Sequence, residues 1–412
     1  MVKIYKTYKY RMYPNKEQES VLARYFGSAR FVYNYFLAER KKQYEENGKS
    51  DNYYVQAKTL TLLKKQEDFA WLKEINSQTL QSALRCLEAA YTNFFSGRTK
   101  FPRFKIKKHG GSFAIPQNCS IKDSKIFIPK FKQGIKIKEH RTFKGDIRNM
   151  TISITPSGRY YVSILSEVDH KPLRKTNKKV GIDLGIKDFI VTSDGVRYSS
   201  NRFIKHYTKK LTKAQKCLSK KSKCSGEWYK MKLRVARIHE KIHNCRMDKL
   251  HKISTDLVRK YDVICCEDLN VKGMQKNRRL AQSIADASWG TFLNLLSYKC
   301  AREDKQLVTI DRFYPSSKTC HHCGYVKKDL SLKDRTWKCP HCGQMIDRDL
   351  NASINILNEG IRNISDGTAD YTEGADVRPV RRLSALKSEA HESLVHEQFT
   401  CPQIVNTIYP NT

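Results

Sequence analysis

The sequence predicts a multi-domain α/β protein with an inserted zinc ribbon, and three observations support this fold class. Two Cys-x-x-Cys pairs lie near the C-terminal end, with fifteen residues between them. Residues 180–310 alternate between strand-like and helix-like patterns, whereas residues 1–168 read as one strand, then helices, then several short strands. At 412 residues the chain is long enough to form several separate hydrophobic cores.

The charge of the chain favours a polyanionic partner. There are 78 Lys and Arg against 41 Asp and Glu, which gives a formal net charge of +37. Lys and Arg bind nucleic-acid phosphates and release condensed counterions. No apolar run approaches the length of a membrane helix, and the N-terminus lacks the apolar stretch of a signal peptide. An odd total of 13 cysteines favours free thiols in a reducing compartment. We therefore expect a soluble, cytoplasmic protein that does not use a membrane.

The N-terminal part predicts a strand followed by a helical domain. Residues 3–14 alternate as a strand that ends at Pro14, and Asn15 with Gln18 forms a capping-box pattern for a helix to about Glu46. Further helices are predicted at 53–67 and 77–96. We assign the aromatic residues of the first helix to a core rather than to a base-stacking platform. The core positions are Leu22, Tyr25, Phe26, Ala29, Val32, Tyr33 and Phe36.

Two segments follow the helices. Residues 100–108 interleave basic and aromatic side chains, which suits a clamp on a nucleic-acid backbone, with a solvated edge strand as the alternative. Residues 112–168 contain short strand patterns separated by turn residues, so they predict a small β-barrel or sheet that residues 3–14 could join.

The next segment predicts strands at 180–184, 189–192, 263–266 and 307–310, with a long basic helical region at about 205–260. Residues 205–252 hold 16 Lys and Arg and three acidic residues, so one face is expected to pack and another to face phosphates. A helix with Trp289 and Phe292 on one face precedes the last strand. Residues 361–412 have the composition of a flexible tail.

The cysteine pairs predict a structural zinc site. Cys320, Cys323, Cys339 and Cys342 have the spacing of a four-thiolate ribbon, in which two turns each present two sulfurs to one tetrahedral ion. Four cysteine ligands leave no open position for water. Three histidines also lie within the ribbon, so a histidine in place of one cysteine stays an open alternative; they are His321, His322 and His341.

Three acidic residues have unusual settings. Asp183 lies in a strand between Gly181 and Gly185, which share its face and are expected to clear room for ions and a phosphate backbone. Glu267 ends a buried strand, and Asp349 opens a helix. That helix is expected to pack on a sheet through Leu350, Ile354 and Leu357.

Together the three acids fit an RNase H-like α/β core, in which carboxylates converge on two divalent cations. Crowded carboxylates repel, and Mg²⁺ relieves that repulsion. One ion would activate water, and the other would stabilise the leaving 3′ oxygen of a phosphodiester. The sequence leaves open whether Asp268 or Asp347 shares the metal.

These motifs resemble the TnpB family, the transposon-encoded, RNA-guided DNA nucleases related to type V CRISPR effectors. The resemblance rests on Gly-Ile-Asp-Leu-Gly, Glu-Asp-Leu-Asn, Tyr-Pro-Ser-Ser-Lys-Thr-Cys, the ribbon and Asp-Arg-Asp-Leu-Asn-Ala-Ser-Ile-Asn-Ile. It also rests on Tyr-Arg-Met-Tyr-Pro-Asn-Lys-Glu-Gln and Phe-Pro-Arg-Phe-Lys, and it covers about residues 1–358. Ser353 stands where the family usually has Ala, and Thr99-Lys100 stand where Gly is common.

The resemblance implies a RuvC-like nuclease core whose catalytic, Mg²⁺-binding carboxylates are Asp183, Glu267 and Asp349. It implies a guide RNA from the transposon end, a double-stranded DNA target next to a short motif, and a monomeric protein. The implied domains are a wedge-like β-barrel (1–14 and 109–177), a helical recognition domain (15–108), the nuclease core (178–312 and 346–360), the zinc ribbon (313–345) and the tail (361–412).

Three other functions remain open at this point. A DNA transposase would use the same three acids to cut and rejoin ends, and a nuclease-inactive relative would bind DNA as an RNA-guided repressor. A zinc-ribbon DNA-binding protein would use the acids only structurally. The presence of all three acids favours the guided nuclease over the repressor.

Overall fold

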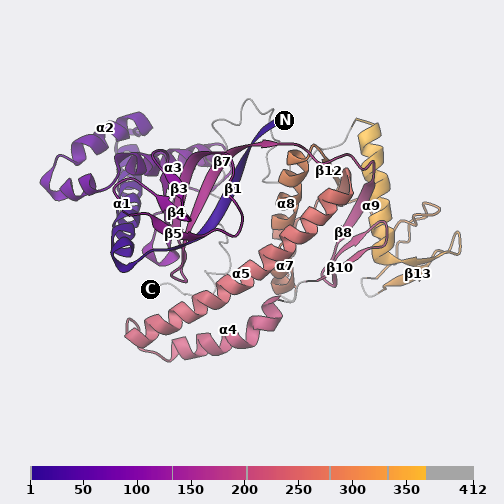
Figure 1. Cartoon of the computed structure of the whole chain (residues 1–412). Helices are drawn as coiled ribbons and strands as arrows, with labels where there is room; N and C mark the ends of the chain where they lie inside the picture. Colours follow the sequence, from indigo (N-terminus) through magenta and orange to yellow (C-terminus); the bar gives the residue numbers. More distant parts are fainter. Residues whose placement is uncertain (1, 132, 201–202, 278–279, 332–333, 368–412) are drawn as a thin grey trace. The chain divides into compact units, whose positions relative to one another are not determined.

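The computed structural model describes residues 2–131, 133–200, 203–277, 280–331 and 334–367. The described residues fall into two compact units that divide between His170 and Lys171 (Figure 1). Each unit has its own sheet and its own hydrophobic core. Within these described ranges, none of the helices combines the length and apolarity needed to cross a lipid bilayer.

The first unit contains an antiparallel sheet of seven strands in the order β2-β6-β7-β1-β5-β4-β3. The predicted contribution of the N-terminal strand is confirmed, because β1 pairs with β7 along its length and with β5 at its end. The strands are β1 (Val2–Tyr13), β2 (Gly111–Ile115), β3 (Ser120–Lys122), β4 (Lys125–Phe127), β5 (Ile135–Lys138), β6 (Asp146–Ile154) and β7 (Tyr160–His170).

Helices α1 (Lys16–Asn47), α2 (Tyr53–Leu63) and α3 (Ser77–Phe95) lie between β1 and β2 in the chain. A 3₁₀ helix, η1 (Glu67–Glu74), connects α2 to α3. The predicted capping box is present: Asn15 Oδ1 accepts the Gln18 N–H at 2.8 Å, and Gln18 Oε1 accepts the Asn15 N–H at 3.1 Å. The seven core positions predicted for α1 are all buried, so the core assignment is confirmed.

Residues 100–108 form no strand, so the edge-strand alternative is wrong. The segment is irregular up to the 3₁₀ helix η2 (Lys107–His109). Asn34 fixes it by bonding both the N–H and the carbonyl of Lys105, at 2.8 and 3.0 Å. Phe101 and Phe104 stay exposed, and the backbone clamp remains a prediction.

The second unit contains a mixed sheet of five strands in the order β10-β9-β8-β11-β12. Strand β8 is parallel to β11, which is parallel to β12, whereas β9 and β10 follow as antiparallel hairpin strands. The strands are β8 (Lys179–Leu184), β9 (Asp188–Thr192), β10 (Arg197–Ser199), β11 (Val263–Glu267) and β12 (Gln306–Ile310). A two-stranded sheet, β13 (Thr336–Lys338) and β14 (Met345–Asp347), belongs to the cysteine-rich segment.

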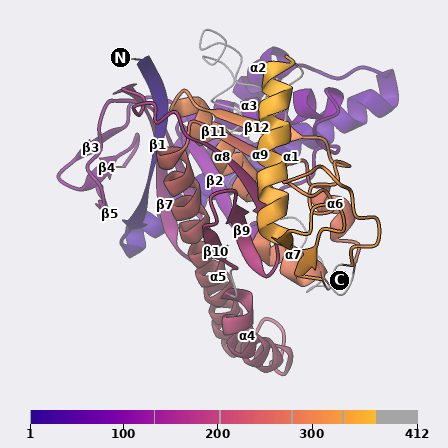
Figure 2. The same cartoon turned by 90° about the vertical axis from the view of Figure 1, so that its right-hand side faces the viewer.

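Helices cover both faces of this sheet (Figure 2). Alternate residues of the strands, such as Ile264 and Cys266, pack against α5 and α8, whereas Cys265 packs against α9. The helices are α4 (Phe203–Ser219), α5 (Gly226–Lys260), α6 (Val271–Met274), α7 (Ala281–Ala287), α8 (Trp289–Arg302) and α9 (Arg348–Ser365). The predicted basic region is therefore two helices, broken between Ser219 and Gly226.

Helix α9 corrects two predictions. It continues to Ser365, beyond the predicted start of the tail at 361, and residues 368–412 lie outside the described residues. Its buried face contains Ser353, Ile356 and Gly360; of the three predicted positions Leu357 packs against the core at this face, whereas Leu350 and Ile354 are only partly buried and are not part of that core. Small residues occupy this face because the helix approaches the sheet closely: a Cβ added at Gly360 would lie 2.4 Å from Cys265 Sγ.

Candidate functional site

Neighbouring parallel strands bring Asp183 and Glu267 to the same edge of the sheet. Ile182 pairs with Cys266, and the two acids are the next residues along β8 and β11. Because Ile182 and Cys266 pack towards α5 and α8, alternation turns both acids towards the opposite face, where α9 lies. Asp349 is in the first turn of α9. Three elements distant in sequence thus contribute one carboxylate each.

The three carboxylates influence one another electrostatically. Burial, together with the negative charges of Glu267 and Asp349, raises the pKa of Asp183 to about 7, although Arg348 and the Leu184 N–H oppose the shift. Burial also raises the pKa of Glu267, opposed by a hydrogen bond from Ser316 Oγ to Glu267 Oε1 at 2.5 Å. A bound cation would favour the ionised forms, which is the behaviour expected of a metal site built from carboxylates.

The two neighbouring acids have other partners. Asp347 is the N-cap of α9: its Oδ1 accepts the Leu350 N–H at 2.9 Å and lies 2.8 Å from Arg197 Nη2. Asp268 is paired with Arg312. The charges that most raise the pKa of Asp183 are Glu267 and Asp349, so the geometry favours these two over their neighbours.

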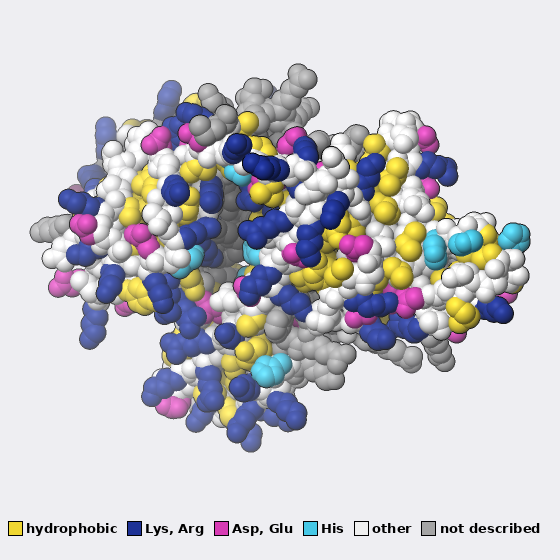
Figure 3. Space-filling model, turned by 45° about the vertical axis from the view of Figure 1, so that its right-hand side comes forward, with side chains coloured by type: hydrophobic (Ala, Val, Ile, Leu, Met, Phe, Trp, Pro, Cys, Tyr) yellow, Lys and Arg dark blue, Asp and Glu magenta, His cyan; other side chains and the backbone are white. Residues whose placement is uncertain are grey.

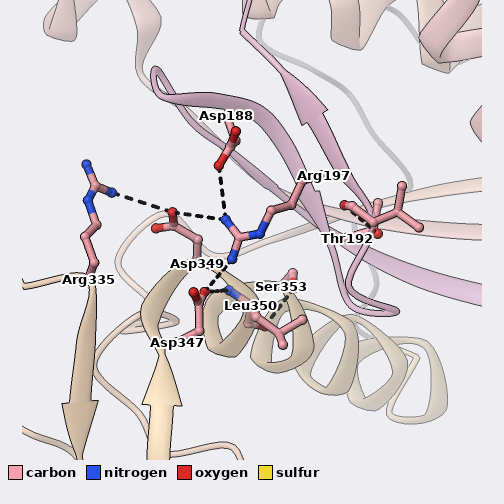
Figure 4. A network of polar contacts seen from close by, with 9 residues as sticks. Asp188, Thr192, Arg197, Arg335, Asp347, Asp349, Leu350 and Ser353 are labelled. Atoms are coloured by element: carbon pink, nitrogen blue, oxygen red, sulfur yellow. Dashed lines mark hydrogen bonds and ion pairs between the residues drawn. The ribbon is translucent and has the colours of Figure 1, made fainter.

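Two arginines that the sequence did not single out lie beside Asp349 (Figure 4). Arg197 Nη1 is 3.1 Å from Asp188 Oδ2 and 3.9 Å from Asp349 Oδ2. Arg335 Nη1 is 3.5 Å from the same Asp349 oxygen. Arg197 was missed because its strand, β10, has only three residues and no alternating apolar pattern. These cations screen Asp349, and their fork of N–H donors also suits a phosphodiester.

Gly181 and Gly185 do not clear space for ions, and this prediction is wrong. A Cβ at Gly181 would lie 2.0 Å from the carbonyl oxygen of Ser353, in α9, and one at Gly185 would lie 2.6 Å from the carbonyl oxygen of Asp188. Gly181 instead lets α9 lie against β8. The glycine therefore serves the site indirectly, because the helix that it admits carries Asp349.

The four predicted zinc ligands come together. Their Sγ atoms all lie within 4.8 Å of one another, and the Cys320–Cys342 and Cys323–Cys339 Sγ pairs are 3.7 and 3.6 Å apart. A tetrahedral zinc ion with Zn–S bonds of about 2.3 Å requires S–S edges of roughly 3.8 Å, so the cluster fits this ion. Among the described residues, this cluster consists of the four cysteines and contains no histidine.

The two cysteine turns have the same backbone pattern. The Gly324 N–H donates to the Cys320 carbonyl at 2.9 Å, and the Gly343 N–H donates to the Cys339 carbonyl at 2.9 Å. Both glycines have positive φ, 75° and 73°, a conformation that is costly for residues with a Cβ. The sequence Cys-x-x-Cys-Gly thus specifies each turn that presents two sulfurs.

Family comparisons match three parts of the chain. A "Cas12f1-like, TNB domain" model matches residues 289–356, and a "Probable transposase" model matches residues 163–278. A "Helix-turn-helix domain" model matches residues 1–49, although the structure has a strand and one long helix there. A solved structure, a Cas12f1–sgRNA–target DNA complex, shares the fold with a TM-score of 0.52 and 13% identity over 86% of this chain and 99% of that one.

Curated relatives match almost the whole chain. A protein of Streptomyces pristinaespiralis named "Putative RNA-guided DNA endonuclease" is 37% identical over 93% of this chain and 94% of its own length. "Putative RNA-guided DNA endonuclease InsQ" of Escherichia coli is 32% identical over 86% of this chain and 92% of its own. The "TnpB-like protein L79" of a mimivirus is 25% identical over 86% of this chain and 73% of its own length. The chain therefore belongs to the TnpB family of transposon-associated proteins.

Proposed function

We propose that this protein is an RNA-guided, Mg²⁺-dependent endonuclease that cleaves double-stranded DNA next to a short motif. The observation that carries the proposal is the placement of Asp183, Glu267 and Asp349 at the ends of β8 and β11 and the start of α9, where the charges of Glu267 and Asp349 raise the pKa of Asp183. The names of the relatives that match nearly the full length support the guide RNA and the DNA target.

The mixed order of the five-stranded sheet supports an RNase H-like, RuvC-type core. In this proposal the three carboxylates would hold two Mg²⁺ ions, and these ions would supply an activated water and stabilisation of the leaving 3′ oxygen. The protein supplies the framework: β8 and β11 fix two carboxylates, and the packing of α9 fixes the third. Arg197 and Arg335 are placed to bind the phosphodiester close to Asp349.

The other parts receive roles by family analogy. Residues 1–14 and 109–177 would form the wedge, residues 15–108 the recognition domain, and residues 178–312 and 346–360 the nuclease core. The ribbon (313–345) would hold a structural zinc ion through its four cysteines, a role that the sulfur geometry supports. The basic helices α4 and α5 would contact nucleic-acid phosphates, and the protein would act as a monomer.

Dependence on a guide tests this proposal. The protein would be co-expressed with RNA from the transposon end, and the complex would be given duplexes that do or do not match the guide. We expect cleavage only of matching duplexes and only with Mg²⁺. Cleavage without RNA, with joining of strands, would instead indicate a transposase, and RNA-dependent binding without cleavage would indicate a repressor.

A further inference from the structure

We propose that Ser316 is a positioning residue that fixes the Glu267 carboxylate, and that Asn351 and Asn355 of α9 hold Ser316 in place. This inference deepens the proposed nuclease function and rests on it. It assigns a task to three buried polar residues that do not belong to the carboxylate set or to the cysteine cluster. It also links the first zinc turn to the acidic site through one loop.

The contact between Ser316 and Glu267 is direct. Ser316 Oγ donates to Glu267 Oε1 at 2.5 Å. Ser316 is only 6% exposed, so water competes little for this carboxylate oxygen. Since Glu267 ends β11 and Ser316 lies in the loop after β12, the bond joins residues 49 positions apart. The carboxylate is therefore oriented from outside its own strand.

Two asparagines of α9 bind the loop that carries Ser316. Asn355 Nδ2 donates to the carbonyl oxygens of Ser316 and Thr319 at 2.8 and 2.6 Å. Asn351 Nδ2 donates to the same two oxygens at 3.3 and 2.7 Å. The side chains lie one helical turn apart and are 0% and 4% exposed for Asn351 and Asn355, respectively. Two buried amides thus fix the backbone of one short loop.

Asn351 extends the same network into the ribbon. Its Oδ1 accepts the backbone N–H of His321 at 2.9 Å. Cys320, one of the four clustered cysteines, lies between Thr319 and His321 in the chain. Both amides bind the carbonyl of Thr319. Asn351 accepts through Oδ1 and donates through Nδ2, which explains why this position is Asn rather than Asp: a carboxylate could not donate to the two carbonyls. The loop is held between the cysteine cluster and Glu267.

Helix α9 therefore places two of the three carboxylates. It carries Asp349 in its first turn, and through Asn351 and Asn355 it holds the loop whose serine orients Glu267. A contact of this kind, to a carboxylate that holds a metal, commonly changes metal affinity or activity 10- to 100-fold when it is removed. A purely structural serine would affect stability without changing metal affinity.

The first test removes the hydroxyl. Ser316→Ala keeps the backbone carbonyl that the asparagines bind, and Ser317→Ala in the same loop is the matched control. Mn²⁺ binding to the RNA-free protein is measured by calorimetry. The Asp183→Ala variant, which lacks one carboxylate of the site, reports how much Mn²⁺ binds elsewhere on the protein. The Mg²⁺ dependence of single-turnover cleavage is measured alongside. We expect Ser316→Ala to weaken both about tenfold or more, with an unchanged unfolding temperature and zinc content, and Ser316→Thr to restore them.

The second test removes an amide. Asn355→Ala is compared with Asn358→Ala, an exposed position on the same helix. We expect Asn355→Ala to weaken metal binding in the same direction and Asn358→Ala to match the parent. Metal affinity and cleavage within twofold of the parent in both Ser316→Ala and Asn355→Ala would overturn the inference, as would loss of stability without loss of affinity. If the parent protein itself did not cleave guide-matched DNA, the proposed function would fail instead, and if Asp183→Ala still bound metal and cleaved DNA, the assignment of the carboxylate site would fail.

Discussion

Asp183 lies in an environment that opposes its ionisation. Its pKa is raised to about 7 by burial and by the charges of Glu267 and Asp349. The sequence pointed to these three acids because each stands at the end of an apolar strand or the start of a helix. It could not show which acid of each neighbouring pair faces inwards, because that depends on partners from other elements, such as Arg312 for Asp268.

The raised pKa predicts how the metal-free protein responds to pH. The pKa of Asp183 is higher in the folded chain than its ordinary value of 3.8, so the protonated carboxyl group stabilises the folded state. This contribution to the free energy of unfolding is fully present below about pH 4 and is lost as the pH rises through 7. We expect Asp183→Asn to stabilise the protein without Mg²⁺ at pH 8 by up to about 4 kcal/mol, and by less at pH 5. Thermal unfolding at both pH values measures this difference, and an equal effect at pH 5 and pH 8 would contradict the electrostatic cause.

Gly181 is predicted to be essential for the packing of α9. In Gly181→Ala the added Cβ meets the backbone oxygen of Ser353, which cannot rotate away, so we expect a loss of about 1–3 kcal/mol in the free energy of unfolding. Cleavage should also fall because Asp349 moves with the helix.

Gly290 provides the matched control for this substitution. It lies in α8 with no atom within 4 Å of an added Cβ, and Gly290→Ala should be neutral or slightly stabilising. Denaturant unfolding compares the two variants. Equal stability of both would show that α9 can shift at no cost.

At the scale of the elements, local pattern predicted most of the helices and long strands. The capping box at Asn15 and the buried positions of α1 follow from short-range periodicity, and the structure has both. Strand β10 was missed, since it has three residues and exists only through pairing with β9. The packing face of α9 was only partly predicted: Leu357 packs against the core, but the close approach to the sheet also requires small residues, Ser353 and Gly360, which the apolar pattern does not mark.

The cysteine cluster predicts a joint loss of zinc, stability and activity. In Cys339→Ser one of the four sulfurs is missing, so we expect the ribbon to lose its ion and cleavage to fall about tenfold or more, because the loop of Ser316 is anchored beside Cys320. Zinc content and cleavage are measured on the purified protein. Cys224→Ser, an exposed cysteine outside the cluster, is the control. Full activity without zinc would contradict this account.

At the scale of the whole molecule, the charge is the most informative property. The excess of Lys and Arg is concentrated in places such as the hairpin of α4 and α5, whose tip is covered by basic side chains (Figure 3). The sequence predicted this polyanion-binding character and the separation of an N-terminal sheet from a C-terminal one. It could not predict the order of either sheet, which depends on contacts distant in the chain.

The basic hairpin predicts a salt-dependent contribution to nucleic-acid binding. Removing two exposed positive charges with Lys209→Gln and Lys213→Gln should weaken guide-RNA binding and reduce the slope of log K against log salt by about 1–2. Fluorescence anisotropy at several NaCl concentrations measures the slope. The control is Lys41→Gln with Lys42→Gln on α1, where the lysines are close to Glu45 and Glu46. An unchanged slope in the hairpin variant would exclude phosphate contacts there.

The assignment of the carboxylate site is tested most directly by comparing the acids one by one. Single-turnover cleavage of a guide-matched duplex would be measured for Asp183→Asn, Glu267→Gln and Asp349→Asn, with Asp268→Asn as the control beside Glu267. We expect each of the first three variants to bind guide RNA and fold normally but to lose cleavage, whereas Asp268→Asn should keep it. Cleavage that survives in any of the three, or is lost equally in Asp268→Asn, would contradict the assignment of the site.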